Sequence, residues 1–200
     1  MESMSMSVRV KLSVMMFLQF MLFAVWWVPL AAYLGNIGIE GNFKSLILST
    51  MAFGCLASPI IGMIADRHFA SQKVLATLNI VCAIFLFLAA IQTSPVALFV
   101  LLLIAMLCYM PSWGLTSAIA MSNSPTEKFP QIRVFGSIGW VASGLFSLVA
   151  LKVFKIELFD GTKLPMICGA VCCLIAAAVN FTLPNTPPPA KGQKASVIDA

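Results

Sequence analysis

Arg133, Ser137 and Trp140 form the pattern in the sequence that most suggests binding of a small polar ligand. They are spaced at i, i+4 and i+7, so a helix would carry all three on one face. A guanidinium and a hydroxyl can hydrogen-bond to ligand oxygens, and an indole can stack on a flat ring. The alternative is that Arg133 extends to an aqueous surface while Trp140 simply packs, and the spacing leaves both open.

A second candidate is the polar stretch from Gly62 to Lys73, which also contains Asp66 and Arg67. An acidic residue at the C-terminal end of a helix opposes the helix dipole. We therefore expect Asp66 to have a partner, such as Arg67, Lys73 or the N-terminus of another helix, and we expect Gly62 to allow close helix approach. Taken alone, the same charges would also suit an ordinary loop at a membrane surface.

Gln19 and Tyr109 are two further polar residues inside apolar stretches. Gln19 could contact a ligand or hydrogen-bond to another helix, and Tyr109 could line a cavity beside a kink at Pro111. The six cysteines fall in apolar stretches and are interpreted as small packing residues. With a single histidine, the chain lacks the spacing of a Cys/His metal site, so we expect no metal.

The elements that carry these residues are predicted to be membrane-spanning helices. Hydrophobic residues make up 60% of the chain and charged residues 10%, whereas soluble domains carry about 25% charged residues. A span needs about 20 apolar residues. Charge-free stretches predict six spans, near 11–34, 43–65, 74–92, 96–122, 132–153 and 164–183. The expected fold class is an all-α integral membrane protein, with residues 1–183 forming one six-helix transmembrane domain.

Proline and small residues predict how these spans pack. Pro59 and Pro111 lie inside two spans and predict kinks. Two stripes of small residues would let helix backbones approach closely, and they are Gly54, Ser58 and Gly62, and Gly139, Ser143 and Ser147. Residues 184–200 are rich in proline and then polar, so we expect a linker toward a C-terminal half that the chain does not contain.

The distribution of Lys and Arg predicts the orientation in the membrane. With both ends on one side, that side holds Arg9, Lys11, Arg67, Lys73, Lys128, Arg133, Lys191 and Lys194. The other side holds Lys44, Lys152, Lys155 and Lys163. We therefore expect both ends to be cytoplasmic. Because the net charge of +5 sits in these loops, it does not call for a nucleic-acid partner.

The stretch from Gly62 to Lys73 resembles the signature of the major facilitator superfamily, a Gly-x-x-x-Asp-Arg turn followed by a basic residue. Gly62, Asp66, Arg67 and Lys73 match it, whereas Phe69 and Ala70 stand near the place where that loop usually has a glycine. The resemblance implies that these four residues act as a cytoplasmic gate that engages a helix of the C-terminal half.

From about residue 9 to Pro184, the chain resembles the bacterial nucleoside permeases, which are nucleoside:proton symporters of that superfamily. Residues 129–140, 17–20 and 109–115 carry this resemblance. It implies that the chain is the N-terminal half of a protein that imports nucleosides across the inner membrane by proton symport and alternating access, and that this half alone does not transport. Arg133, Ser137 and Trp140 would line the nucleoside site, with serine and tryptophan in place of threonine and phenylalanine.

Two alternatives stay open. The first is a carrier of the same superfamily for another polar metabolite, such as a sugar. The second is a six-helix membrane protein without transport activity, although the lack of paired carboxylates or a Ser/His pair argues against an enzyme. The spans also contain no carboxylate away from their ends. We therefore expect a coupled proton to be carried by the C-terminal half, and no cofactor besides it.

Overall fold

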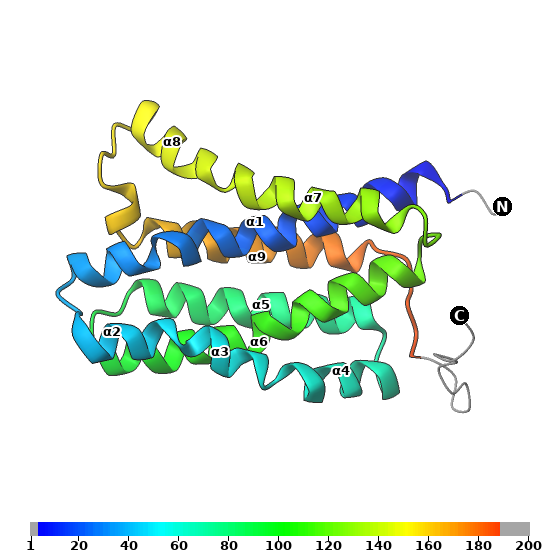
Figure 1. The fold of residues 1–200 in the computed structure, drawn as a ribbon, viewed down its shortest axis with the longest axis horizontal. Helices are drawn as coiled ribbons and strands as arrows, with labels where there is room; N and C mark the ends of the chain where they lie inside the picture. Colours follow the sequence, from blue (N-terminus) through cyan, green and yellow to red (C-terminus); the bar gives the residue numbers. More distant parts are fainter. Residues whose placement is uncertain (1–3, 189–200) are drawn as a thin grey trace.

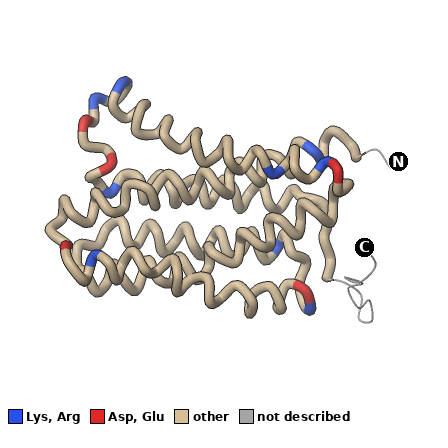
Figure 2. Tube along the Cα trace, in the orientation of Figure 1, with Lys and Arg blue, Asp and Glu red and all other residues tan. Residues whose placement is uncertain are grey.

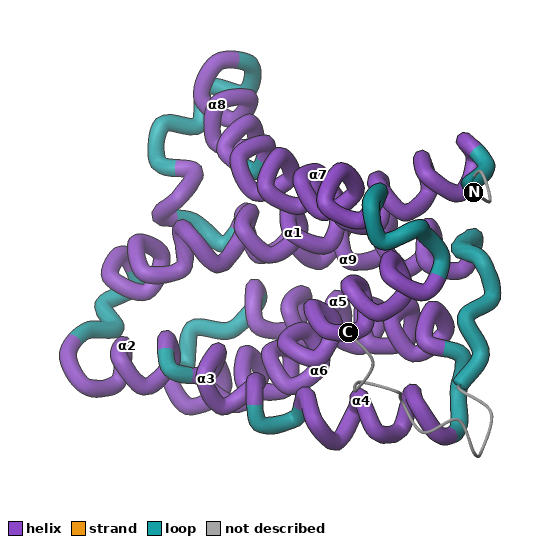
Figure 3. The backbone as a smooth tube through the Cα atoms, turned by 45° about the vertical axis from the view of Figure 1, so that its right-hand side comes forward, coloured by secondary structure: helices purple, strands orange, loops and turns teal. Residues whose placement is uncertain are grey.

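The computed structural model describes residues 4–188, which are helical apart from the connecting turns and loops and contain no strand (Figures 1 and 3). Four long helices are α1 (Met6–Asn36), α5 (Ser71–Ala90), α6 (Pro95–Ser122) and α9 (Leu164–Phe181). Two further runs are divided, into α2 (Gly41–Leu48), α3 (Thr50–Cys55) and α4 (Ser58–Arg67), and into α7 (Phe129–Ala142) and α8 (Gly144–Lys152). A short 3-10 helix, η1 (Phe159–Gly161), precedes α9.

Six helical runs are long and apolar enough to cross a membrane, by length and composition. They confirm the predicted all-α fold class with six spans. The first helix begins at Met6, earlier than predicted, because the Ser5 side chain accepts a hydrogen bond from the backbone N–H of Val8 and caps it. Charged residues gather toward the two ends of the bundle (Figure 2), as expected when the middle of each span meets hydrocarbon.

The helices pack side by side in an order that differs from their order in the chain (Figure 1). Each helix packs against the next in the spatial order α7, α1, α9, α5, α6 and α3. The divided runs therefore form the two edges of the bundle. In the most apolar window of each edge run, 17% of the residues are buried, against 44–61% in the other four runs. The edge runs thus have protein neighbours over only a small part of their surface.

The breaks within the edge runs fall at or next to a proline or a serine. Pro59 lacks an N–H and crowds the carbonyl four residues earlier, and the helix is interrupted at residues 56–57, just before it. The Ser49 and Ser143 hydroxyls donate to the carbonyls of Leu46 and Trp140, and each run is interrupted at that serine. Helix α6, in contrast, continues through Pro111 without interruption.

Glycines mark the closest helix contacts. A Cβ atom at Gly54 would lie 2.6 Å from the carbonyl oxygen of Met106, and one at Gly139 would overlap the carbonyl of Phe17. These two residues confirm the predicted close approach of helix backbones. Gly62 does not, because a Cβ there would meet no atom of residues 4–188 within 4 Å. Its helix, α4, lies at the edge of the bundle, where few neighbours are available.

Candidate functional site

Arg133 lies about one turn into α7, and its guanidinium packs on an aromatic ring of α1. The guanidinium carbon lies 4.3 Å from the centroid of the Phe20 ring. The side chain is half-buried, and none of the hydrogen bonds or ion pairs formed within residues 4–188 involves its guanidinium. Its N–H groups are therefore free to donate to a ligand.

Phe20 belongs to an aromatic cluster built from three helices, which we define as Phe20, Phe23, Tyr109, Trp113 and Trp140. Phe20 stacks on Trp113 with 5.4 Å between ring centroids. Phe23 stacks on Tyr109 at 4.6 Å and contacts Trp140 at 5.8 Å. The cluster thereby joins α1, α6 and α7, and Trp140, at 37% exposure, is its most accessible member.

The three residues predicted on α7 are placed differently relative to this cluster. Arg133 and Trp140 contact its α1 members, Phe20 and Phe23 respectively. Ser137 is exposed and lies between them along the helix. The structure thus brings a guanidinium and an indole onto one aromatic surface, with a hydroxyl nearby on the same helix.

Gln19 and Tyr109 lie behind that surface. Gln19 is fully buried, and its amide nitrogen donates to Ser112 Oγ at 2.7 Å and to Asn79 Oδ1 at 3.3 Å. The Asn79 amide donates back to Gln19 Oε1 at 3.0 Å. The Tyr109 hydroxyl donates to the Gln19 carbonyl at 2.7 Å and accepts from the Trp113 indole N–H at 2.8 Å. These bonds join α1, α5 and α6, so Gln19 does hydrogen-bond to other helices. Direct contact of Gln19 or Tyr109 with a ligand stays a prediction.

The residues predicted to form a gate lie at the turn between α4 and α5. Asp66, Arg67 and Lys73 are all exposed, and the Asp66 carboxylate makes no hydrogen bond or ion pair within residues 4–188. The turn closes over residues 68–70 without a left-handed residue, since Ala70 has φ −65° and ψ 127°. A glycine is therefore not needed there. The gating role and a partner for Asp66 stay predictions.

The segment that follows α9 is fixed against this turn. The backbone N–H of Ser71 donates to the carbonyl of Thr186 at 3.0 Å. The Gln72 amide accepts from the N–H of Thr186 at 2.9 Å and donates to Asn185 Oδ1 at 2.7 Å. Asn123, just after α6, donates to the Thr186 hydroxyl at 2.8 Å. The predicted linker therefore begins with an anchored stretch; its residues 189–200 lie outside the described residues.

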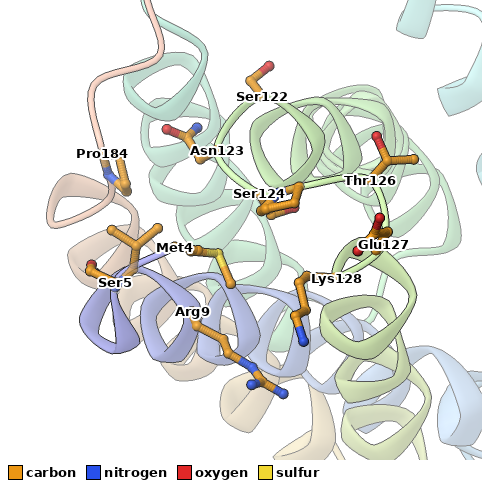
Figure 4. Close-up of a pocket in the computed structure, with 12 residues that line it drawn as sticks. Met4, Ser5, Arg9, Ser122, Asn123, Ser124, Thr126, Glu127, Lys128 and Pro184 are labelled. Carbon is orange, nitrogen blue, oxygen red and sulfur yellow. The ribbon is translucent and has the colours of Figure 1, made fainter. Parts of the chain in front are cut away.

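An open pocket of about 920 Å³ lies where the ends of α1 and α6 meet the loop into α7 (Figure 4). Its walls carry Arg9, Lys128 and Glu127 together with several hydroxyl groups. Arg9 already donates to Gln131 Oε1 at 2.9 Å. None of the predicted substrate-binding or gating residues lines this pocket. Among residues 4–188, no group of three or more His, Cys, Asp or Glu residues could hold a metal ion.

Six runs long and apolar enough to span a membrane are those of a multi-pass membrane protein. The chain belongs to the nucleoside H+ symporter family, whose model matches residues 6–199. The predicted family resemblance is thereby confirmed.

Individual relatives agree with this family. The putative nucleoside transporter YegT of Escherichia coli (strain K12) is 37% identical over 191 residues, covering 94% of this chain and 45% of that protein. The xanthosine permease of the same organism is 31% identical, covering 91% and 44%. The chain thus spans about half the length of the curated relatives it matches.

Solved structures show the same fold. A crystal structure of a mutant of the nucleoside transporter NupG matches with a TM-score of 0.84 at 26% identity, covering 94% of this chain and 48% of that one. A further NupG crystal structure matches with a TM-score of 0.80 at 28% identity, covering 91% and 45%. These matches confirm the predicted fold class, one six-helix half of a transporter of the major facilitator type.

Proposed function

We propose that the full-length protein imports nucleosides by proton symport, and that this chain supplies one wall of the nucleoside site. The observation that carries the proposal is the Arg133 guanidinium, which has free N–H groups and lies on an aromatic cluster inside a membrane-spanning run. A nucleoside combines a flat base with a sugar rich in hydroxyl groups. It would stack on Trp140 and accept hydrogen bonds from Arg133 and Ser137.

In this proposal Gln19 and Tyr109 act from behind the site. Their hydrogen bonds tie α1, α5 and α6 together, and α1 and α6 carry the aromatic rings on which Arg133 and Trp140 rest. Family relatives support the substrate class, since their names describe a nucleoside transporter and a xanthosine permease. The proposed activity is transport rather than catalysis, and it requires no cofactor besides the coupled proton.

We further propose that the site is completed by a second six-helix half and works by alternating access. Carriers of this architecture bind substrate between two halves. The sparsely buried edge runs would face that half and the lipid bilayer. Asp66, Arg67 and Lys73, all exposed at the turn between α4 and α5, would gate the cytoplasmic side.

The membrane is proposed to be the bacterial inner membrane, with both described ends of the chain on the cytoplasmic side. The first and last described residues lie at the same end of the bundle (Figure 1). The excess of Lys and Arg in the loops at that end supports the orientation.

Uptake of labelled uridine or adenosine into vesicles that contain the full-length protein tests the proposal. We expect saturable uptake that a protonophore abolishes and that unlabelled nucleosides, but not sugars, compete away. Arg133→Gln should raise KM strongly, whereas Lys152→Gln, which removes an exposed charge at the end of α8, should leave uptake unchanged. Absence of saturable uptake of any nucleoside, or competition by sugars instead, would overturn the proposal.

A further inference from the structure

Arg133 sits in a membrane-spanning run without the partner that a cation there usually has. Charged groups inside a membrane are costly and commonly pair with an opposite charge or with backbone carbonyls. Within residues 4–188, the guanidinium makes no such hydrogen bond or ion pair, and its carbon lies over the Phe20 ring, 4.3 Å from the ring centroid. We propose that Phe20 is a positioning residue, whose ring holds the Arg133 guanidinium for the substrate. This inference rests on the proposed function, in which Arg133 binds the nucleoside.

The kind of contact matters for what Arg133 can still do. A carboxylate partner would take up two N–H groups of the guanidinium in a bidentate pair. The face of an aromatic ring instead attracts the cation as a whole, so it does not take up two of the five N–H donors as a bidentate carboxylate does. Phe20 can therefore fix the position of Arg133 and leave its donors available to ligand oxygens.

Phe20 is itself held in place. Its side chain is 9% exposed, and its ring stacks on Trp113 at an interplanar angle of 23°. The Trp113 indole N–H donates to the Tyr109 hydroxyl, which donates to the carbonyl of Gln19, the residue next to Phe20. The ring that contacts Arg133 is thus connected to the buried hydrogen bonds between α1 and α6.

Gly136 provides the space in which the two side chains meet. A Cβ atom at Gly136 would lie 2.7 Å from Arg133 Nη1 and 2.9 Å from Phe20 Cδ2. Both distances are far below van der Waals contact, so any larger residue would displace the guanidinium, the ring or both. The glycine, the ring and the cation therefore form one arrangement contributed by two helices.

The test compares nucleoside uptake by variants of the full-length protein. Phe20→Leu removes the ring, and we expect KM to rise about 5- to 30-fold with kcat changed less than twofold. Phe20→Tyr keeps the ring and should restore a KM near the wild-type value. Phe87→Leu, the same substitution at an exposed position of α5 outside the proposed site, is the matched control and should leave both constants unchanged.

Two further variants separate positioning from general damage to the fold. Gly136→Ala leaves Phe20 in the chain and should raise KM as Phe20→Leu does, which keeps the inference testable if Phe20→Leu does not fold. In an Arg133→Gln background, Phe20→Leu should add nothing to KM, because the group that Phe20 positions is gone. An apparent melting temperature measured for each purified variant shows which of them are folded.

The outcomes distinguish this inference from the proposed function. If Arg133→Gln leaves KM unchanged, the proposed site is wrong. If Arg133→Gln raises KM but Phe20→Leu does not, the site stands and the positioning role is overturned. An equal effect of Phe20→Leu with and without the Arg133 side chain would also overturn it.

Discussion

Gln19 takes part in a buried hydrogen-bond network between helices. Its amide is buried together with Asn79 and Ser112, and the three side chains satisfy one another across α1, α5 and α6. An unpaired amide in an apolar interior costs free energy, so these residues are expected to set which faces of the three helices meet.

Replacing Gln19 by leucine should therefore destabilise the protein. The Asn79 amide would remain buried without its partner, at a cost of about 1–3 kcal/mol, and the apparent melting temperature in detergent should fall by several degrees. Thr77→Val is the matched control, because within residues 4–188 the exposed Thr77 hydroxyl bonds only a carbonyl of its own helix. The double variant Gln19→Leu/Asn79→Leu should recover part of the loss. Equal melting temperatures for Gln19→Leu and Thr77→Val would contradict this account.

The α7 residues of the candidate site could be predicted from the sequence, but their surroundings could not. Arg133, Ser137 and Trp140 are recognisable because helical spacing along one segment fixes a shared face. Phe20 and Phe23 are also spaced at i and i+3, yet that spacing is equally typical of core packing. Their contacts with Arg133, Trp113 and Trp140 depend on how three helices come together. Nothing local in the sequence specifies this.

At the scale of the helices, the six spans were predictable because hydrocarbon excludes charge over about 20 residues at a time. The ends of the helices and the interruptions within them were less predictable. The cap at Ser5 depends on a single hydroxyl group, and the breaks at Ser49 and Ser143 fall at serines that bond a carbonyl three residues earlier. Ser112 bonds the Tyr109 carbonyl in the same way inside the unbroken α6. A pattern of apolar residues does not distinguish these cases.

The contact between α1 and α7 should depend on Gly139. A Cβ atom there would overlap the Phe17 carbonyl, so Gly139→Ala should push the helices apart and cost about 1–3 kcal/mol. The expected result is a lower apparent melting temperature. Gly144→Ala is the control, since a Cβ at Gly144 meets no atom of the described part of the chain within 4 Å and alanine favours helix over glycine by about 1 kcal/mol. If the two variants melt alike, the close approach does not contribute to stability.

For the molecule as a whole, the orientation across the membrane can be measured with single cysteines. The background for this test replaces the six native cysteines, of which Cys55 is exposed. A cysteine replacing Glu157, in the loop after α8, should react with an impermeant maleimide applied from outside the inner membrane. A cysteine replacing Thr126, in the loop before α7, should react only after that membrane is opened. Both positions are exposed, so access decides the outcome. The reverse labelling pattern would refute the proposed orientation.

The stretch that follows α9 has a mechanical consequence. Because Thr186 is bonded to Ser71, Gln72 and Asn123, any chain joined beyond residue 188 starts from a fixed point beside the turn between α4 and α5. The free length of such a tether, which sets the effective concentration of whatever it carries, is therefore counted from Thr186 and not from the end of α9. A force applied along the tether would act on Ser71 and Gln72 before it acted on α9. The hydrogen bonds of Thr186 would therefore couple the position of an attached partner to the position of this turn.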